Sequence, residues 1–190
     1  PAQVLMSAAR LRIAVSRRAL AALSSIESLR ASAGALGILP PMPGFDSVDL
    51  SPELRAVAQE LGFSAMTPIQ ARSIPILLAG KDLIGQSKTG SGKTAAFTLP
   101  ILQNLALDGC SLQALVLCPT RELCAQVARE IRRFGRKLSG LQVLVVSGGL
   151  PIRPQTAALQ RGVHIVVGTP GRVLDHLGRG NLDLHPVTTV

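Results

Sequence analysis

The stretch SKTGSGKT, which runs from Ser87 to Thr94, has the residue types and spacing of a loop that binds phosphate groups. Its end, Gly92-Lys93-Thr94, matches the last three positions of the pattern G-x-x-x-x-G-K-[ST], although Ser87 stands at the first glycine position. Gly90 and Gly92 free the backbone to wrap an anion at the start of a helix. In such loops the lysine reaches the β- and γ-phosphates of a nucleotide, and the threonine hydroxyl binds Mg²⁺. The phosphate-binding residues are therefore predicted to be Ser87, Lys88, Thr89, Gly90, Ser91, Gly92, Lys93 and Thr94, with Lys93 and Thr94 as catalytic residues and Thr94 as the metal ligand.

The sequence on both sides of this loop predicts an α/β fold built on a doubly wound, mostly parallel sheet. Continuous apolar runs span 113–119, 141–149 and 163–170, and each ends in a glycine or proline turn. Runs that are apolar on both faces are typical of parallel strands covered by helices. A shorter strand is expected at Asp82–Gln86, directly before the phosphate loop.

Helices are predicted between these strands from their start and stop signals. Ser51-Pro52-Glu53 has the N-cap, first-turn proline and acid of a helix start, and Thr67-Pro68 repeats the signal. Gly62 and Gly80 are expected to end these two helices. A third helix is expected to begin at Lys93.

A further helix is predicted after Thr120, where apolar residues recur at steps of three and four. Its apolar stripe consists of Leu123, Val127, Ile131, Phe134 and Leu138. Basic residues fall between them, and we interpret these as a solvated face. They are Arg129, Arg132, Arg133, Arg136 and Lys137.

The composition is that of a globular chain, since 47% of the 190 residues are hydrophobic and 16% are charged. No apolar run is long enough to span a membrane, so no membrane contact is expected. The cysteines Cys110, Cys118 and Cys124 have no C-x-x-C spacing and are interpreted as reduced core thiols of a cytoplasmic protein. The formal net charge of +9 favours an anionic partner.

Residues 1–41 differ in composition from the rest of the chain. They contain five arginines and one acid, and they lead into the breaker GILPPMPG. Three interpretations compete: a disordered or weakly helical extension, an organellar targeting peptide, or sequence upstream of the true start. We favour an upstream or accessory segment, because Met42 stands directly before the organised part. The folded domain is then 42–190.

Five short stretches, in this order and at these intervals, resemble the first RecA-like domain of the DEAD-box ATP-dependent RNA helicases. They are GFSAMTPIQ (Gly62–Gln70), SKTGSGKT, PTREL (Pro119–Leu123), Gly148-Gly149 and TPGR (Thr169–Arg172). The resemblance extends from about Phe45 to the end of the chain. LCPTREL and HIVVGTPGR are most similar to the bacterial branch that acts on ribosomal RNA.

The resemblance implies that the nucleotide is ATP, bound with Mg²⁺. GFSAMTPIQ is similar to the Q motif of the family, in which Gln70 would read the adenine edge with its amide. Phe45 lies seventeen positions before Gly62, where the family places an aromatic ring that stacks on the base. Phe45, Thr67 and Gln70 are therefore expected to bind the cofactor together with the phosphate loop.

Three strand ends supply a second candidate surface. Thr120, Gly148-Gly149 and Thr169 all follow apolar strands, and the carboxyl ends of strands in an open α/β sheet line the crevice where ligands bind. Thr120 and Thr169 also open helices, where free N–H groups suit phosphate oxygens, although plain helix capping explains them as well. The resemblance implies contact with the RNA backbone, with Arg121 and Arg172 as the cations. The expected RNA-binding residues are Pro119, Thr120, Arg121, Glu122, Gly148, Gly149, Thr169, Pro170, Gly171 and Arg172.

Aromatic residues are scarce, since the chain has four phenylalanines and no tryptophan or tyrosine. Single-strand binders that stack bases need exposed aromatic platforms. We therefore expect the domain to hold the sugar-phosphate chain with little sequence preference.

The resemblance also implies what lies beyond Val190, because in the family the next strand carries the Asp-Glu-Ala-Asp box. We expect an N-terminal fragment whose sheet is incomplete at its C-terminal end. The parent enzyme would couple ATP hydrolysis to local unwinding of RNA duplexes. The fragment alone would be inactive, because the Walker B acids and its partner, the second RecA-like domain, are absent. The alternative is a short protein that binds nucleotide or RNA without ATP turnover.

Overall fold

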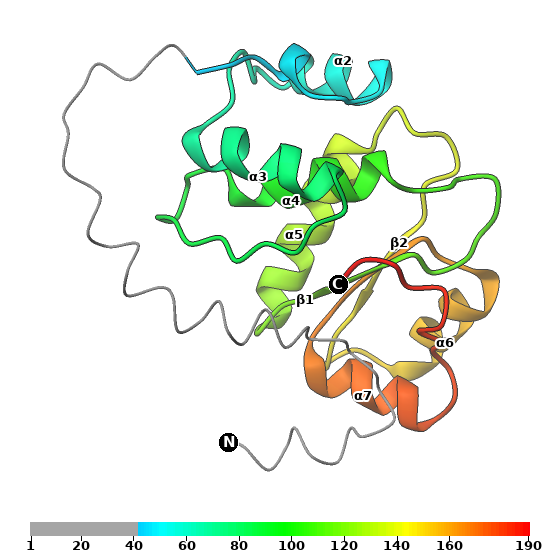
Figure 1. Ribbon diagram of the computed structural model, residues 1–190. Helices are drawn as coiled ribbons and strands as arrows, with labels where there is room; N and C mark the ends of the chain where they lie inside the picture. The colour runs from blue at the N-terminus through cyan, green and yellow to red at the C-terminus, as the bar shows by residue number, and fades with distance from the viewer. Residues whose placement is uncertain (1–41) are drawn as a thin grey trace. The chain divides into compact units, whose positions relative to one another are not determined.

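Three apolar segments pair in parallel at the centre of the computed structural model, which describes residues 42–190. The strands are β1 (Ala114–Leu117), β2 (Val143–Val146) and β3 (Ile165–Gly168), in the spatial order β1-β3-β2 (Figure 1). All four residues of the central strand β3 are buried, as expected for a strand covered on both faces. The predicted extension 1–41 lies outside the described residues.

Helices connect and cover these strands. Within residues 42–190 they are the 3₁₀ turn η3 (Phe45–Ser47) and the α-helices α2 (Pro52–Glu60), α3 (Pro68–Leu78), α4 (Lys93–Gln103), α5 (Arg121–Phe134), α6 (Ile152–Arg161) and α7 (Pro170–Gly178). In this part of the chain no helix has the length and apolar character needed to cross a lipid bilayer.

Helices cover both faces of the sheet. Successive side chains of a strand point to opposite faces, so each face packs against its own set of helices. Ile165 and Val167 of β3 belong to a buried cluster that also contains residues of α2, α3, α4 and α5. Val166, between them, belongs to a second cluster with Val173 of α7 and Leu159 of α6. The predicted doubly wound parallel sheet with flanking helices is confirmed.

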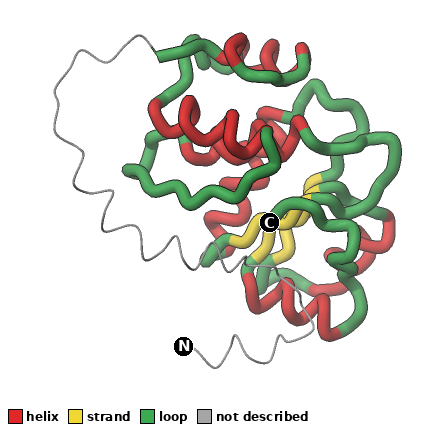
Figure 2. The backbone as a smooth tube through the Cα atoms, in the orientation of Figure 1, coloured by secondary structure: helices red, strands yellow, loops and turns green. Residues whose placement is uncertain are grey.

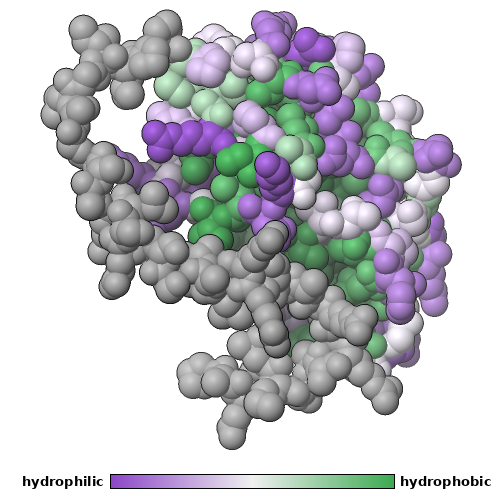
Figure 3. Space-filling model, viewed as in Figure 1, coloured by the Kyte–Doolittle hydropathy of each residue, from purple (hydrophilic) through white to green (hydrophobic). Residues whose placement is uncertain are grey.

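The predicted strand at Asp82–Gln86 is wrong. The chain between α3 and α4 consists of loop and turns, green in Figure 2, and Leu83 and Ile84 are 39% and 54% exposed. A strand requires a hydrogen-bonded neighbour, and the outer edge of β1 pairs instead with Thr189, whose carbonyl accepts from the Leu115 amide at 2.9 Å. Figure 3 shows hydrophobic surface, in green, between hydrophilic residues, in purple, on one face of the molecule.

Two of the predicted helix starts are confirmed by side-chain caps. The Ser51 hydroxyl accepts from the Leu54 amide at 3.3 Å, and the Thr120 hydroxyl accepts from the Leu123 amide at 3.2 Å. Thr169 also precedes a helix, but its side chain makes no cap hydrogen bond. Of the two threonines, only Thr120 therefore satisfies an amide of its helix end with its side chain.

Replacing Thr120 by alanine is expected to lower the free energy of unfolding by about 1 kcal/mol, because one amide of the first turn of α5 loses its acceptor. Thr169→Ala is the matched control and should change stability little, since no cap bond is lost. Urea denaturation of both variants measures the difference. Equal losses would mean that the Thr120 cap does not stabilise α5.

The apolar stripe on α5 is only partly as predicted. Val127, Ile131 and Phe134 are buried, but Leu123 is 37% exposed at the start of the helix. Leu138 lies beyond the end of α5 and is partly buried against the same core.

The basic side chains of α5 and its C-terminal extension do more than face solvent. Arg136 and Lys137 both form ion pairs with Glu60 of α2, and Arg132 donates to the Val143 carbonyl of β2 at 2.6 Å. These contacts link the end of α5 to a second helix and to the sheet. The interpretation as a purely solvated face is therefore too simple.

The cysteines divide into two groups. Cys118 and Cys124 are buried free thiols, as predicted, whereas Cys110 is exposed in the loop before β1 and is not a core residue. Burial raises the pKa of Cys118, and burial together with the adjacent Cys118 raises the pKa of Cys124 to about 11. Both buried groups therefore remain protonated thiols at neutral pH.

Candidate functional site

The phosphate loop packs directly against the start of α3. Gly90 and Gly92 both have positive φ angles, +75° and +89°, which favour glycine. A Cβ atom on Gly92 would overlap the Gln70 side-chain nitrogen and would lie 3.1 Å from the Thr67 hydroxyl oxygen. The backbone N–H groups in the first turn of α4 have no helical carbonyl to donate to, so they can bind an anion. The loop therefore has the backbone geometry of an anion site.

The Lys93 ammonium lies across this loop. Its Nζ donates to the carbonyl oxygens of Ser87 at 2.6 Å and Lys88 at 2.5 Å, and the Ser87 and Ser91 hydroxyls share a hydrogen bond of 2.6 Å. A phosphate group in the loop would compete with the two carbonyls, and it is the stronger acceptor for an ammonium because it is charged.

Gln70 is fully buried, and both ends of its amide are engaged inside the protein. Its Oε1 accepts from the Thr67 amide at 2.8 Å, and its Nε2 donates to the Gly92 carbonyl at 3.2 Å. The Thr67-x-x-Gln70 spacing is that of a capping box, so its first bond could have been foreseen. The bond to the phosphate loop had no local signal. The predicted contact of Gln70 with adenine stays a prediction.

Thr67 presents a polar atom that the rest of 42–190 leaves without a full hydrogen bond, although it faces the Gln70 backbone amide in the capping box. Its Oγ1 is buried and has no hydrogen-bond partner among residues 42–190. Such an atom is costly unless a ligand or water satisfies it. Its position next to Gly92 is compatible with a polar ligand in the phosphate loop.

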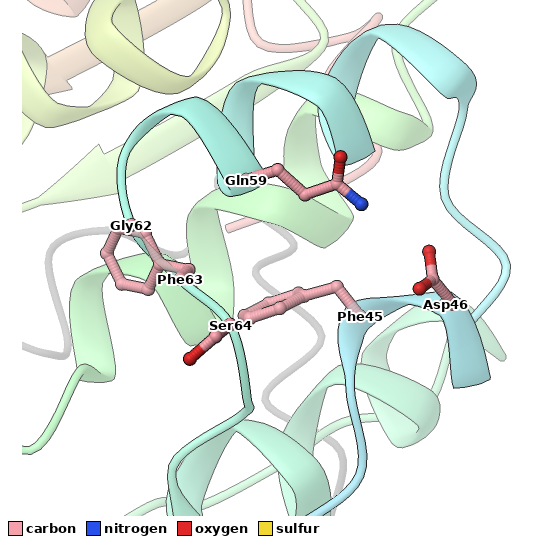
Figure 4. A pocket seen from close by; sticks show the side chains of 6 residues that line it. All are labelled: Phe45, Asp46, Gln59, Gly62, Phe63 and Ser64. Atoms are coloured by element: carbon pink, nitrogen blue, oxygen red, sulfur yellow. The ribbon is translucent and has the colours of Figure 1, made fainter.

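Phe45 lines a pocket of about 250 Å³ next to η3 (Figure 4). Its ring is buried and meets the Phe63 ring edge-on, with centroids 6.2 Å apart and planes at 86°. The pocket is also lined by Phe63 itself and by Asp46, Gln59, Gly62 and Ser64. No residue of the phosphate loop lines this pocket, so the stacking of Phe45 on a nucleotide base stays a prediction.

The carboxyl ends of the three strands meet at one edge of the sheet. The Cys118 amide donates to the Gly168 carbonyl at 2.9 Å, and the Thr169 amide donates to the Val146 carbonyl at 3.0 Å. The strand order β1-β3-β2 thus brings the three predicted RNA-binding segments side by side. Most of their residues are exposed: Pro119, Thr120, Arg121, Glu122, Gly149, Pro170 and Gly171, with Gly148 and Thr169 half-buried.

Arg121 and the Gly148-Gly149 loop are in direct contact at this edge. A Cβ atom on Gly149 would overlap the Arg121 guanidinium, and Gly149 has a φ of +81°. Arg121 is itself exposed. The glycine therefore both permits the turn and leaves room for a cation that solvent or an anion can reach.

Arg172 has a different environment from the one expected of a surface cation. Its side chain is only 16% exposed, and one guanidinium nitrogen donates to the Leu150 carbonyl at 3.0 Å and to Gln155 Oε1 at 3.2 Å. Gln155 also forms a hydrogen bond with His176. Burial and the nearby Arg172 lower the pKa of His176. Sequence reasoning missed Gln155 and His176, because neither belongs to a recognisable motif.

Metal ligands are sparse in the described part of the chain. Among residues 42–190 no group of three or more His, Cys, Asp or Glu side chains is placed to hold a metal ion. The predicted Mg²⁺ ligand Thr94 lies in the first turn of α4. A single protein hydroxyl is sufficient for this role, because Mg²⁺ bound with a nucleotide takes most of its ligands from phosphates and water.

Comparison with known proteins places the chain in one family. The model of the DEAD/DEAH box helicase family matches residues 67–190. The chain is 47% identical over 150 residues to the ATP-dependent RNA helicase DbpA of Escherichia coli, covering 78% of this chain and 33% of that protein. It is 45% identical over 149 residues to the DEAD-box ATP-dependent RNA helicase CshA of Geobacillus kaustophilus, covering 78% and 32%. The chain thus spans about a third of the length of these relatives.

Two solved structures have the same fold. A DEAD box protein from Methanococcus jannaschii superposes with a TM-score of 0.73 and 38% identity, covering 78% of this chain and 40% of that one. A hypothetical ATP-dependent RNA helicase from Sulfolobus tokodaii gives a TM-score of 0.65 and 40% identity, covering 73% and 40%.

Proposed function

Since this chain belongs to the DEAD/DEAH box helicase family, we propose that residues 42–190 form part of the first RecA-like, ATP-binding domain of an ATP-dependent RNA helicase. The observation that carries the proposal is the hydrogen bond from Gln70 to the Gly92 carbonyl, which ties α3 to a loop shaped for phosphate. A glycine-rich turn that bound no ligand would not need such close packing between Gly92 and the Gln70 side chain.

ATP would be held by three groups of residues. Loop 87–94 and the first turn of α4 bind the phosphates, with Lys93 moving from its two carbonyls to the phosphate oxygens. Thr67 and Gln70 lie at the loop on the side of α3, and Phe45 stacks on the base. Thr94 would ligate Mg²⁺, and the ion would supply charge neutralisation at the phosphate oxygens.

RNA would lie along the edge formed by the strand ends, held by its sugar-phosphate backbone. The exposed Arg121 supplies positive charge there, and the helix starts at Thr120 and Thr169 supply free amides. Contacts of this kind carry little sequence information. We therefore propose binding with little sequence preference.

The activity of the full-length protein is proposed from its relatives. The relatives are about three times as long as this chain, and their names describe ATP-dependent RNA helicases. We propose that ATP hydrolysis is coupled to RNA unwinding in the full-length protein, with a second RecA-like domain as the partner. The free thiols among the described residues suit a cytoplasmic location.

Arg121→Ala is expected to weaken binding of single-stranded RNA uniformly across sequences. The slope of log affinity against log salt concentration should fall by about 0.7, because one phosphate contact no longer releases a counterion. Fluorescence anisotropy with labelled oligonucleotides, in about 50 to 200 mM KCl, measures both quantities.

The matched control is Arg129→Ala, which removes an exposed arginine about two turns further along α5. Its slope should equal that of the wild-type chain. Arg121→Lys keeps the charge and should keep most of the slope. A loss that depended on RNA sequence would contradict recognition of the backbone.

A further inference from the structure

A buried amide connects three elements beneath the Gly148-Gly149 loop. Gln155 of α6 is 5% exposed, and its Nε2 donates to the Ser147 carbonyl at the end of β2, at 3.1 Å. Its Oε1 accepts from His176 Nε2 at 3.1 Å and from Arg172 at 3.2 Å, both on α7. One side chain thus joins β2, α6 and α7.

These contacts fasten the loop at both ends. The carbonyl of Ser147 is held by Gln155, and the carbonyl of Leu150 is held by Arg172. The two residues between them are glycines, which have no side chains and the greatest backbone freedom. The position of the loop therefore depends on the polar groups that hold its ends.

The chemistry at position 155 requires an amide. The Ser147 carbonyl needs a donor, while His176 and Arg172 need an acceptor, and an amide offers both from one planar group without a change of protonation. A carboxylate would place an oxygen against the Ser147 carbonyl. A hydrocarbon would leave the Ser147 carbonyl and His176 Nε2 unpaired, and Arg172 would keep only the Leu150 carbonyl. Each unpaired buried group carries a free-energy cost.

His176 is fully buried and is suited to a donor role in its neutral form. Its Nε2 must carry the proton to bind Gln155 Oε1, while its Nδ1 is buried without a partner among residues 42–190. An imidazole of this tautomer is neutral, so its unpaired nitrogen carries no charge.

We propose that Gln155 and His176 are positioning residues, which hold the Gly148-Gly149 loop and Arg172 in the geometry that binds the RNA backbone. The inference rests on the proposed RNA binding and changes the expected role of Arg172, which supports the loop from beneath while Arg121 meets the RNA. Because Gln155 and His176 do not reach the surface, any effect of theirs on RNA must pass through the loop.

Gln155→Leu in the full chain tests this role. RNA affinity is expected to fall about tenfold, because the loop loses its anchor while Leu and Gln have similar volumes. The salt slope should stay at the wild-type value, since no cation is removed. Affinity for ATP should be unchanged. A purely structural residue would lower the melting temperature without changing RNA affinity at temperatures well below it.

His176 supplies the conservative comparison. His176→Gln keeps an N–H donor near the position of Nε2 and should retain most of the RNA affinity, whereas His176→Leu removes the donor and should weaken binding. Where Gln155→Leu does not fold, this pair of variants carries the test. In a double-mutant cycle, Gln155→Leu and Arg172→Ala should be non-additive, because both act on one network.

Folded Gln155→Leu and His176→Leu variants with wild-type RNA affinity would overturn the inference and leave the proposed function intact. A steeper or shallower salt slope would also overturn it, since the change would point to a direct phosphate contact. Absence of RNA binding by the wild-type chain would overturn the proposed function, and with it the positioning role.

Discussion

Replacing Gly92 by alanine is expected to weaken nucleotide binding by about 30-fold or more. Two effects combine at this position. Its φ of +89° costs an alanine about 1–2 kcal/mol, and the new Cβ overlaps the Gln70 side-chain nitrogen. Gln70 must then move, which leaves its amide or the Gly92 carbonyl unpaired at about 1–3 kcal/mol. Titration with a fluorescent ATP analogue measures the affinity.

Gly90→Ala is the matched control in the same loop. Gly90 has a similar φ of +75°, but a Cβ atom there would have no neighbour within 4 Å. Only the backbone strain should appear, so its loss of affinity should be clearly the smaller of the two. Equal losses would show that contact between the loop and α3 contributes nothing to nucleotide binding.

Gln70→Ala is expected to weaken nucleotide binding by about 1–3 kcal/mol, because the Thr67 amide and the Gly92 carbonyl both lose a buried partner. Gln70→Glu keeps the acceptor for Thr67 and removes the donor to Gly92. If the hydrogen bond to the Gly92 carbonyl supports nucleotide binding, Gln70→Glu should lose nearly as much affinity as Gln70→Ala. Calorimetric titration with ATP and with GTP measures both variants.

Comparison of the two nucleotides separates two roles of Gln70. If its amide reads the adenine edge, the variants should lose affinity for ATP and keep their affinity for GTP. If it only holds the phosphate loop, both nucleotides should weaken by the same factor. Gln126→Ala, which removes an exposed glutamine on α5, is the control. Wild-type affinity of Gln70→Ala for both nucleotides would remove Gln70 from the site.

Local patterns in the sequence were sufficient for much of the fold. Within the run 163–170, the residues Ile165–Gly168 are apolar without interruption, and they form the central strand β3, buried on both faces. Thr120 and Ser51 are residues whose hydroxyls cap helices, and both make the predicted bonds. Such features depend on interactions within a few residues, so the sequence around each position specifies them. The phosphate loop, PTREL and TPGR are recognisable for the same reason.

Features that depend on distant partners were decided only by the tertiary structure. Asp82–Gln86 has the composition of a strand, yet it forms none, because strand formation requires a neighbour and β1 pairs with Thr189. The motif around Arg172 predicted a cation for RNA contact, but it gave no sign that Gln155 of α6 and the Leu150 carbonyl bind its guanidinium. The bond between Gln70 and Gly92 spans 22 residues, and Gln155 lies 21 residues from His176. No local pattern encodes such distances, because the packing of separate helices brings these groups together.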